Sequence, residues 1–499
     1  MNPADPSLFR RADALLAQGR WREAIAAYRQ ALAAVSTAAD GWFNLGYALR
    51  REGAYEEALD AYARALRHGV RGAEEAHLNR AVIYSDHLRR DDAAEAELRR
   101  ALEIAPDYAP ALLNLGGLLE DRGRREPALA CYERILAKHA ASPSGHEALA
   151  RAAHLHVPAS IDDPLFVRVR QAAENDPTFD DSSRANLYFV LGGALDKLGD
   201  YAQAFAAFEA GKRFAHRRFA PYHAQRAHAR TDALIGAFPQ AAAQVGAGAS
   251  ARKPAPVFIC GMFRSGSTLL EQVLGAHPEI ATGGELNTLP RMAATELAPF
   301  PASVASLDAA RCAELANLYR SRLPAGVREQ AVGKTWLTDK RPDNYLLIGL
   351  IKRLFPDAKI IHTVRNPLDN ALSVFMLQLH PRVFDYAGRL TDIGHHFGEY
   401  QRLMAHWKQL FPDDIHDFDY DAFVAKPEET LRPLLDFLGL AWNEQCLQFH
   451  RRDNVVKTAS DWQVRRPLYG DASGRWQRYR EFLGPLFTAL DAAGVAARR

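Results

Sequence analysis

A repeat with a period of about 34 residues dominates the first half of this 499-residue chain. Three of its members share a glycine, an alanine five residues later and a tyrosine nine residues later: Gly19, Ala24 and Tyr28; Gly53, Ala58 and Tyr62; Gly123, Ala128 and Tyr132. Leu88, Ala93 and Glu97 stand at the corresponding places of the third repeat. Repeats of this length are helix pairs that must stack, because one pair cannot bury its apolar face alone. The first half is therefore predicted to be an all-α solenoid.

Small residues on the first helix of each pair, Gly46, Ala81 and Gly116, let the second helix approach closely. Residues 191–208 repeat the pattern once more, and less regular helices are predicted at 142–180 and 212–240. This period and residue pattern resemble tetratricopeptide repeats. Two uses of the array stay open. Its concave face could hold a protein or peptide, or the solenoid could only form a homodimer or support an enzyme.

Charge and hydropathy limit the classes of protein to consider. The chain has 62 basic and 60 acidic residues, which argues against a general nucleic-acid binder. The four cysteines have neither metal-ligand nor redox spacing. Neither an apolar signal-peptide core nor an apolar run of about 18 residues occurs. We therefore expect a cytoplasmic protein with reduced thiols that does not enter a membrane.

The pattern changes after a Gly/Ala-rich stretch at 241–256, which is predicted to link a repeat array at 1–240 to a second domain at 257–499. Short β-rich runs follow at 256–261, 358–366 and 414–421. Helical patterns occur at 266–276, 342–355, 367–379, 393–411 and 428–438. This alternation predicts an α/β domain with a central parallel sheet that binds ligands at the carboxyl ends of its strands.

A glycine-rich loop, Gly261 to Thr268, follows the first of these runs and opens a helix. Backbone N–H groups of such a loop bind phosphate oxygens, and the helix N-terminus adds partial positive charge. The spacing is that of a nucleotide P-loop, but Ser267 stands where that motif has lysine, and Arg264 supplies the charge instead. We found no aspartate-ended strand to hold magnesium. A metal-free phosphate or phosphosulfate site is therefore favoured over an ATPase or kinase site, and an ordinary strand-to-helix turn remains the alternative.

A second anion site is predicted where Arg365 ends a strand and Ser373 follows eight residues later. An arginine fork and a serine hydroxyl at this spacing can converge on one phosphate. A surface salt bridge for Arg365 and an indifferent helix position for Ser373 are the alternatives.

Both segments resemble sulfotransferases that use 3′-phosphoadenosine-5′-phosphosulfate. The loop is similar to their 5′-phosphosulfate loop, and Arg365 with Ser373 to their 3′-phosphate motif. The continuation through the A-H-P and G-E segments, up to Glu285, resembles the tyrosylprotein sulfotransferase branch, although that branch commonly has threonine at position 267. The resemblance covers roughly residues 254–480. It implies a P-loop-like sulfotransferase domain that uses this donor without a metal, and the fused array resembles bacterial sulfotransferases with tetratricopeptide repeats.

The resemblance also implies roles for individual residues. Glu285 would be the catalytic base, Arg264 and Lys340 would stabilise the transferring group, and Ser460 would assist. Donor contacts are implied for Arg264, Ser265, Gly266, Ser267, Thr268, Leu269, Arg365, Ser373, Tyr420, Gln463, Val464 and Arg466. Arg466 stands where the family has lysine. Arg341 rivals Lys340. His362 and His380 are the other candidate bases, but neither has the context to displace Glu285, and a strand histidine such as His362 is more often packed than catalytic.

The acceptor implied by the G-E segment is a protein tyrosine, presented by the repeat array. A glycan, a lipid or a small phenol is the alternative acceptor. A repeat scaffold with a nucleotide-sensing α/β domain is the alternative of another class.

Overall fold

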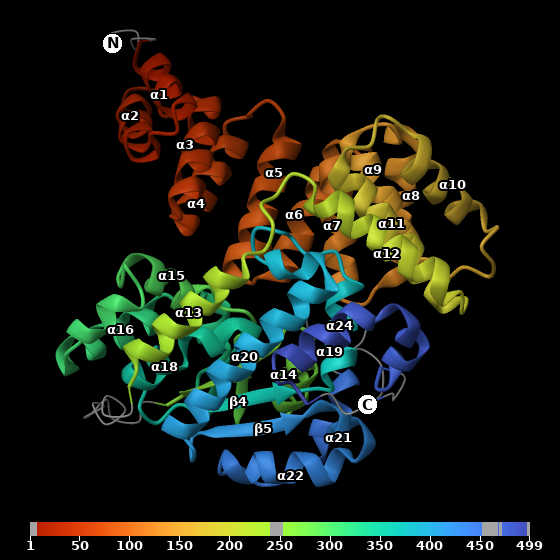
Figure 1. Ribbon diagram of the computed structural model, residues 1–499. Coiled ribbons are helices and arrows are strands. Elements are labelled where there is room, and N and C mark those ends of the chain that lie inside the picture. Colours follow the sequence, from red (N-terminus) through yellow and green to blue (C-terminus); the bar gives the residue numbers. More distant parts are fainter. Residues whose placement is uncertain (1–6, 240–252, 452–467, 469–471, 497–499) are drawn as a thin grey trace. The chain divides into compact units, whose positions relative to one another are not determined.

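The computed structural model describes residues 7–239, 253–451, 468 and 472–496. The chain divides into two compact units, residues 1–152 with 324–326, and residues 153–323 with 327–499. Figure 1 colours the chain from red to blue. The predicted linker at 241–256 falls mostly outside the described residues, so that boundary stays a prediction.

Helices in antiparallel pairs build the repeat region, as the period predicts. They are α1 (Ser7–Ala17), α2 (Trp21–Ala34), α3 (Ala39–Glu52), α4 (Tyr55–Arg67), α5 (Ala73–Val82), the π-helix η1 (Ile83–Leu88), α6 (Asp91–Ile104), α7 (Ala109–Asp121), α8 (Arg125–His139) and α9 (Pro143–Leu155). The small-to-large packing is confirmed. A Cβ on Gly116 would lie 2.5 Å from the ring of Tyr132, so only glycine lets these two helices approach so closely.

The third repeat differs from the prediction by one residue. Arg89, not Leu88, takes the left-handed conformation that Gly53 takes in the repeat before it, with φ of 56° and 86°. The π-helix just before Arg89 winds an extra residue into this turn. As a result Ala94 and Leu98 take the buried apolar places of α6. Ala93 is only half-buried, and Glu97 is buried but paired with Arg80.

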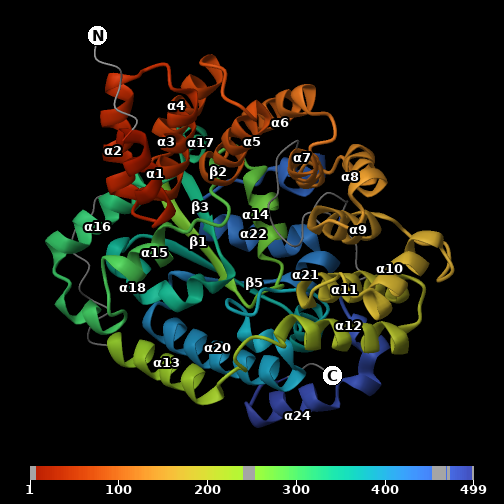
Figure 2. The same ribbon diagram turned by 90° about the horizontal axis from the view of Figure 1, so that it is seen from above.

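Four further helices, α10 (Pro164–Asn175), α11 (Asp181–Lys197), α12 (Tyr201–His216) and α13 (Ala224–Ala237), belong to the second compact unit. Helices α10, α11 and α12 lie side by side in both views (Figure 1, Figure 2). The predicted repeat at 191–208 is the α11–α12 pair, where a Cβ on Gly192 would lie 2.7 Å from the ring of Phe208.

The second unit contains the predicted parallel sheet. Its strands are β1 (Ala255–Gly261), β2 (Ile280–Thr282), β3 (Trp336–Lys340), β4 (Lys359–Val364) and β5 (Ile415–Asp419), in the order β2-β3-β1-β4-β5. Each neighbouring pair is parallel. Strands β1, β4 and β5 correspond to the predicted runs, whereas β2 and β3 were not predicted.

Helices cover both faces of the sheet. The helices that follow β1 in the chain are α14 (Ser267–Gly275), α15 (Thr288–Thr295), η3 (Ala302–Ser306), α16 (Ala309–Ser321), α17 (Ala325–Gln330), η4 (Pro342–Leu347), α18 (Ile348–Leu354), α19 (Pro367–Phe375), η5 (Asp385–Gly388), α20 (Leu390–Leu410), α21 (Tyr420–Ala425), α22 (Pro427–Phe437), η6 (Glu444–Arg451), η7 (Arg475–Phe482) and α24 (Gly484–Ala492). Figure 1 shows α20 and α22 on opposite faces. Side chains of β1 alternate accordingly: Ile259 joins the core with α14 and α22, and Phe258 packs against Tyr319 and Phe355. Among the described residues, no helix combines the length and apolarity needed to cross a membrane.

Candidate active site

One edge of the sheet gathers most of the predicted site residues. The strands are parallel, so their carboxyl ends meet there. The anion loop follows β1, Lys340 ends β3, Arg365 follows β4 and Tyr420 follows β5. Glu285 lies three residues beyond β2. Ser460, Gln463, Val464 and Arg466 lie outside the described residues.

The anion loop turns sharply between β1 and α14. Gly266 has φ of 99°, a backbone conformation that favours glycine, and a Cβ there would lie 2.4 Å from Cδ2 of Tyr420. Both the backbone conformation and the lack of space therefore require glycine at this position. Arg264 also has a left-handed backbone, with φ of 72°, which is uncommon for a residue with a side chain. Ser267, Thr268 and Leu269 form the first turn of α14 and are buried.

Buried hydroxyls fix the floor of the loop. Thr363 donates its hydroxyl proton to the carbonyl oxygen of Cys260 at 3.0 Å. The 2.6 Å contact between Ser265 Oγ and Thr363 Oγ1 therefore has Ser265 as its donor. Ser265 is thus a structural anchor of the loop, because its side chain is only 1% exposed.

The two predicted anion sites adjoin each other. Arg264 Nε donates to Ser373 Oγ at 3.0 Å, and Arg365 Nη1 donates to the carbonyl oxygen of Arg264 at 3.2 Å. The guanidinium of Arg365 also lies over the ring of Tyr420, 4.9 Å from its centroid. Burial raises the pKa of Tyr420, so its hydroxyl stays neutral. The structure thereby brings Arg264 into contact with Arg365 and Ser373, which lie 101 and 109 positions further along the chain.

Helix α19 presents Ser373 and begins at a built N-cap. Asn366 accepts from the backbone N–H of Leu368 at 2.9 Å through its side chain, and Pro367 is the first helical residue. Asp369, on the same turn, accepts from the N–H groups of Gly474 (2.6 Å) and Trp476 (2.8 Å). Residues 474–476 are thus attached to the first turn of α19, and Arg365 Nη2 donates to the nearby carbonyl oxygen of Ala472 at 2.5 Å. Burial raises the pKa of Asp369.

Glu285 and Lys340 form an ion pair. Lys340 Nζ donates to Glu285 Oε1 at 2.6 Å; the lysine side chain is fully buried and that of Glu285 is 36% exposed. The backbone between them is tied as well, since the N–H of Lys340 donates to the carbonyl oxygen of Gly284 at 2.9 Å. Gly284 has φ of 67°, which a glycine adopts without strain. The carboxylate of Glu285 is therefore partly exposed to solvent, while the cation that pairs with it is fully buried.

Arg341, the rival of Lys340, is engaged elsewhere. Its Nε and Nη2 atoms donate to the two oxygens of Asp343, both at 2.9 Å, and Nη1 donates to Asn287 Oδ1 at 2.6 Å. The geometry favours Lys340 as the cation beside Glu285.

Glu271, on α14, is a residue of the site that was not predicted from the sequence. Its Oε1 accepts from the N–H of Gly284 at 3.0 Å and from Thr338 Oγ1 at 2.7 Å, and the side chain is buried. Gly283 N–H in turn donates to Thr338 Oγ1 at 3.2 Å. Glu271 thus ties the turn before Glu285 to the helix that opens at the anion loop. A polar Glu-Gln pair inside the apolar run 267–275 was the signal available in the sequence.

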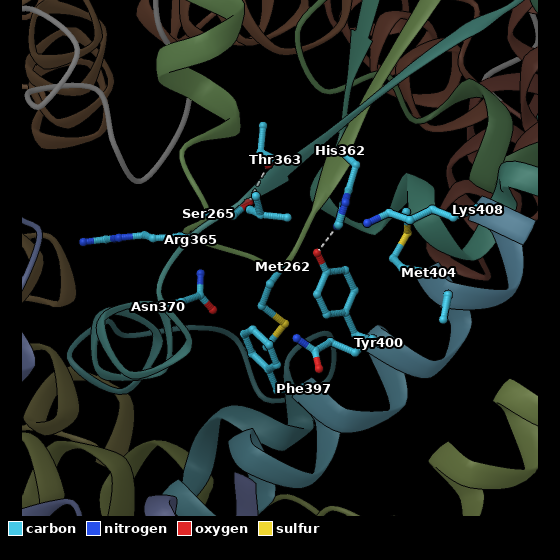
Figure 3. A pocket seen from close by; sticks show the side chains of 13 residues that line it. Met262, Ser265, His362, Thr363, Arg365, Asn370, Phe397, Tyr400, Met404 and Lys408 are labelled. Atoms are coloured by element: carbon cyan, nitrogen blue, oxygen red, sulfur yellow. Dashed lines mark hydrogen bonds between the residues drawn. The ribbon is translucent and has the colours of Figure 1, made fainter. Parts of the chain in front are cut away.

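His362 is packed, as expected of a strand histidine. Its Nδ1 lies 2.7 Å from Asp417 Oδ1, its Nε2 contacts the Tyr400 hydroxyl, and burial lowers its pKa. It borders a cavity of about 330 Å³ between β4 and α20 (Figure 3). The lining residues are Met262, Ser265, His362, Thr363, Val364, Arg365, Asn370, Phe397, Tyr400, Gln401, Met404, Ala405 and Lys408.

Family models match both the repeat region and the α/β region of the chain. The model of the sulfotransferase family matches residues 256–444, and tetratricopeptide-repeat models match residues 9–70, 91–152 and 185–213. The solved sulfotransferase domain from the Synechococcus PCC 7002 olefin synthase is 23% identical and covers 46% of this chain and 89% of its own, with a TM-score of 0.34.

Two curated relatives illustrate how far the likeness extends. An uncharacterised protein of Aquifex aeolicus (strain VF5) is 29% identical over 417 residues, 81% of this chain and 53% of that protein. The protein-tyrosine sulfotransferase of Drosophila melanogaster is 24% identical over 243 residues, 44% of this chain and 46% of that protein. The chain thus spans about half the length of these relatives. Residues 256–444 form a domain of the sulfotransferase family, joined in one chain to tetratricopeptide repeats, and this chain resembles the protein-tyrosine sulfotransferases.

Proposed function

We propose that this chain transfers the sulfuryl group of 3′-phosphoadenosine-5′-phosphosulfate to the hydroxyl group of a protein tyrosine. The observation that carries the proposal is that the two predicted anion-binding segments lie together at one sheet edge, where a carboxylate also lies. Arg264 contacts Ser373 and Arg365, and Glu285 faces the same edge beside Lys340. The likeness to the Drosophila protein-tyrosine sulfotransferase supports tyrosine as the acceptor.

The anion loop and α19 would hold the two ends of the donor. Backbone N–H groups at the start of α14 would bind the 5′-phosphosulfate, and Arg365 with Ser373 would bind the 3′-phosphate. This set of N–H groups, guanidinium groups and hydroxyls suits an anion and needs no metal ion. Tyr420, with Arg365 over its ring, would border the nucleotide.

Transfer would proceed in line at sulfur. The acceptor oxygen forms a bond to sulfur while the bond from sulfur to the bridging phosphate oxygen breaks, and the leaving 3′,5′-bisphosphate takes that electron pair. Glu285 takes the acceptor proton. Lys340 and Arg264 meet the negative charge that grows on the sulfuryl and bridging oxygens, in a site where that charge is poorly hydrated.

A Glu285→Gln variant tests the base. With a donor labelled in its sulfuryl group and tyrosine peptides, we expect kcat to fall at least about 100-fold, because the amide cannot accept the proton. Affinity for 3′,5′-adenosine bisphosphate should persist, which excludes misfolding. Glu279→Gln is the matched control, since Glu279 is an exposed carboxylate just before β2. Wild-type turnover by Glu285→Gln would refute the role of Glu285.

The acceptor is tested in the same assay. Label should enter tyrosine peptides and not their phenylalanine counterparts. Label in a glycan, a lipid or a small phenol instead would replace the tyrosine acceptor, and bisphosphate binding without transfer to any of them would favour the nucleotide-sensing scaffold. Thermal stabilisation by the bisphosphate without metal, larger than by ATP with magnesium, separates this site from a kinase site.

A further inference from the structure

Helix α12 buries a lysine, Lys212, for which the described residues supply no acidic partner. The side chain of Lys212 is enclosed, with the residue 3% exposed, and its Nζ lies 5.4 Å from the ring centroid of Phe189 and 5.7 Å from that of Phe375. Within the described part of the chain, its Nζ is bonded to backbone carbonyl oxygens and forms no ion pair with a carboxylate. An amine buried in this way is costly unless its N–H groups are used. Its hydrogen bonds therefore indicate what it does.

Those hydrogen bonds go to the C-terminal end of α19 and to the turn that follows it. Lys212 Nζ donates to the carbonyl oxygens of Val374 at 3.3 Å and of Leu377 at 2.9 Å. The last carbonyls of a helix have no partner within it and carry partial negative charge, so an amine stabilises them. Burial lowers the pKa of Lys212 to about 7, and both its charged and its neutral form have N–H groups for these two oxygens.

The position of the capped end matters because Ser373 adjoins Val374. Ser373 Oγ is the atom that accepts from Arg264 Nε, and α19 begins next to Arg365. A shift at the end of α19 would therefore move the serine of the second anion segment relative to both arginines.

A second tie from the same helix pair reaches the other end of α19. Asp196, on α11, accepts from the Tyr479 hydroxyl at 2.6 Å and pairs with Arg475 at 2.5 Å. The N–H groups of Gly474 and Trp476, beside Arg475, donate to Asp369 in the first turn of α19. The α11–α12 pair thus reaches α19 at its end directly and at its start through residues 474–476.

We propose that the α11–α12 repeat pair is part of the donor site and that Lys212 is the positioning residue through which it acts on the 3′-phosphate segment. The pair then serves the binding of the nucleotide and not only the presentation of an acceptor. The inference rests on the proposed function for the identity of the donor.

The test compares two nucleotides that differ only in the 3′-phosphate. In Lys212→Met we expect the Kd of 3′,5′-adenosine bisphosphate to rise about tenfold, as two N–H donors are lost, measured by titration calorimetry at a temperature where the protein is folded. The Kd of adenosine 5′-monophosphate should change less than twofold, because the anion loop is untouched. Selectivity for the 3′-phosphate is therefore the readout, and a loss of stability alone would not alter it.

Two controls accompany this variant. Lys197→Met makes the same change at an exposed position of α11 and should bind both nucleotides as the wild type does. Leu434→Ala removes a buried side chain of α22, outside the repeat pair and both anion segments, and should lower stability without altering the selectivity. If Lys212→Met does not fold, Tyr479→Phe removes the hydrogen bond to Asp196 and should change the selectivity in the same direction by a smaller factor.

The outcomes separate the two proposals. Unchanged selectivity in Lys212→Met, or in Tyr479→Phe if that variant replaces it, would overturn the role of the pair and leave the proposed reaction standing. Selective loss of bisphosphate binding, with no transfer by the wild type to any acceptor, would support the positioning role and overturn the reaction. A wild type that does not distinguish the two nucleotides would overturn both.

Discussion

At the scale of single residues, Glu271 decides where the backbone before Glu285 lies. It offers one oxygen to two donors, the N–H of Gly284 and the hydroxyl of Thr338. It is buried, so no water would replace it if it were removed. The buried carboxylate of Glu271 thereby fixes the position of the partly exposed carboxylate of Glu285.

We expect Glu271→Ala to lower kcat for sulfuryl transfer about 10- to 100-fold, because a base displaced by about an ångström loses the aligned geometry of proton transfer. The Kd of the bisphosphate should stay within about twofold, since the hydrogen bonds of the Glu271 side chain go to Gly284 and Thr338 and not to either anion segment. Glu271→Gln keeps an oxygen acceptor at the same place and should restore most of kcat. Steady-state kinetics and calorimetry measure these quantities.

Leu274→Ala is the control for lost stability, since Leu274 is buried on the same helix in the core beneath the sheet. An equal fall of kcat in Leu274→Ala and Glu271→Ala would contradict a positioning role, as would a fall in Glu271→Gln as large as in Glu271→Ala.

Motif chemistry could reveal Arg264, Arg365 and Ser373, because each stands at a spacing that a bound anion explains locally. It could not reveal the roles of Glu271 and Lys212. The donor Thr338 lies 67 positions from Glu271, and the acceptor Val374 lies 162 positions from Lys212, so only the folded chain brings each pair together. The sequence marks Glu271 only as a polar residue in an apolar run, and Lys212 looks like an ordinary charged residue of an amphipathic helix.

At the scale of elements, the two strands that the sequence did not predict are the ones that present Glu285 and Lys340. Strand β2 has only three residues. Strand β3 ends in Thr338, Asp339 and Lys340, polar residues that disfavour a buried strand unless they are satisfied. Tyr319 donates to Asp339 at 2.8 Å, and burial raises the pKa of Asp339 to about 7. Tertiary contacts thus override local propensity at the strand that carries Lys340.

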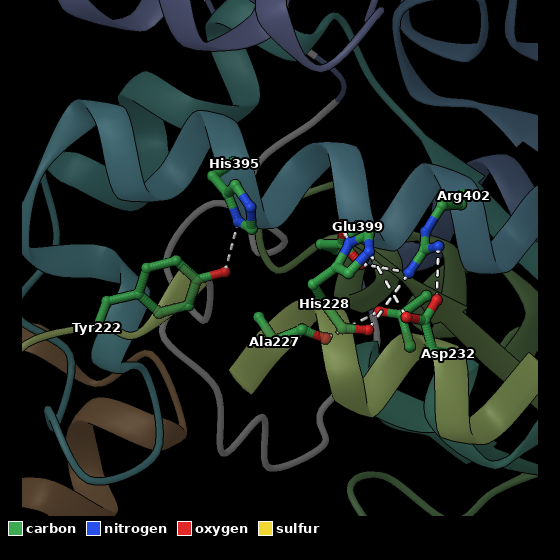
Figure 4. Close-up of polar contacts among 8 residues, drawn as sticks. Tyr222, Ala227, His228, Asp232, His395, Glu399 and Arg402 are labelled. Atoms are coloured by element: carbon green, nitrogen blue, oxygen red, sulfur yellow. Dashed lines mark hydrogen bonds and ion pairs between the residues drawn. The ribbon is translucent and has the colours of Figure 1, made fainter. Parts of the chain in front are cut away.

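Helix α13 lies along α20 and is joined to it by two kinds of contact. A polar seam, shown in Figure 4, pairs Arg402 with Asp232 at 2.8 Å and His228 with Glu399 at 2.9 Å. An apolar contact follows at the end of α13, where the ring of Phe238 packs edge-on against that of Trp407 with 5.5 Å between the ring centroids. We call this contact the apolar anchor.

The anchor should dominate stability. We expect Phe238→Ala to lower the free energy of unfolding by about 3–5 kcal/mol, because a buried ring is lost and leaves a cavity. Asp232→Asn should lower it by less than about 1 kcal/mol, because Arg402 and Asp232 are 36% and 54% exposed and water screens the pair. Urea denaturation measures both. A larger effect of Asp232→Asn would mean that the seam, not the ring, holds α13.

At the scale of the whole molecule, the end of the repeat pattern does not coincide with the end of the first compact unit, which closes at Ala152. The repeat pattern predicts an array at 1–240, yet α10 to α13 belong to the compact unit that contains the sheet. Sequence periodicity reports how each helix pair is built and cannot report what the last pair packs against. Lys212, Asp196 and Phe238 supply those contacts with residues of the sulfotransferase domain.

Truncation at two points tests this organisation. A chain beginning at Ala153 keeps α10 to α13, and we expect it to bind 3′,5′-adenosine bisphosphate within about threefold of the full chain. A chain beginning at Ala241 lacks the partner of α20 and both ties to α19. It exposes apolar surface such as Trp407, which is fully buried in the full chain. We expect it to aggregate or to bind the bisphosphate more than about tenfold more weakly, since two anchors of the 3′-phosphate segment are gone. Full affinity in the shorter chain would show that the last repeat pair is dispensable and that the domain boundary lies at the predicted linker.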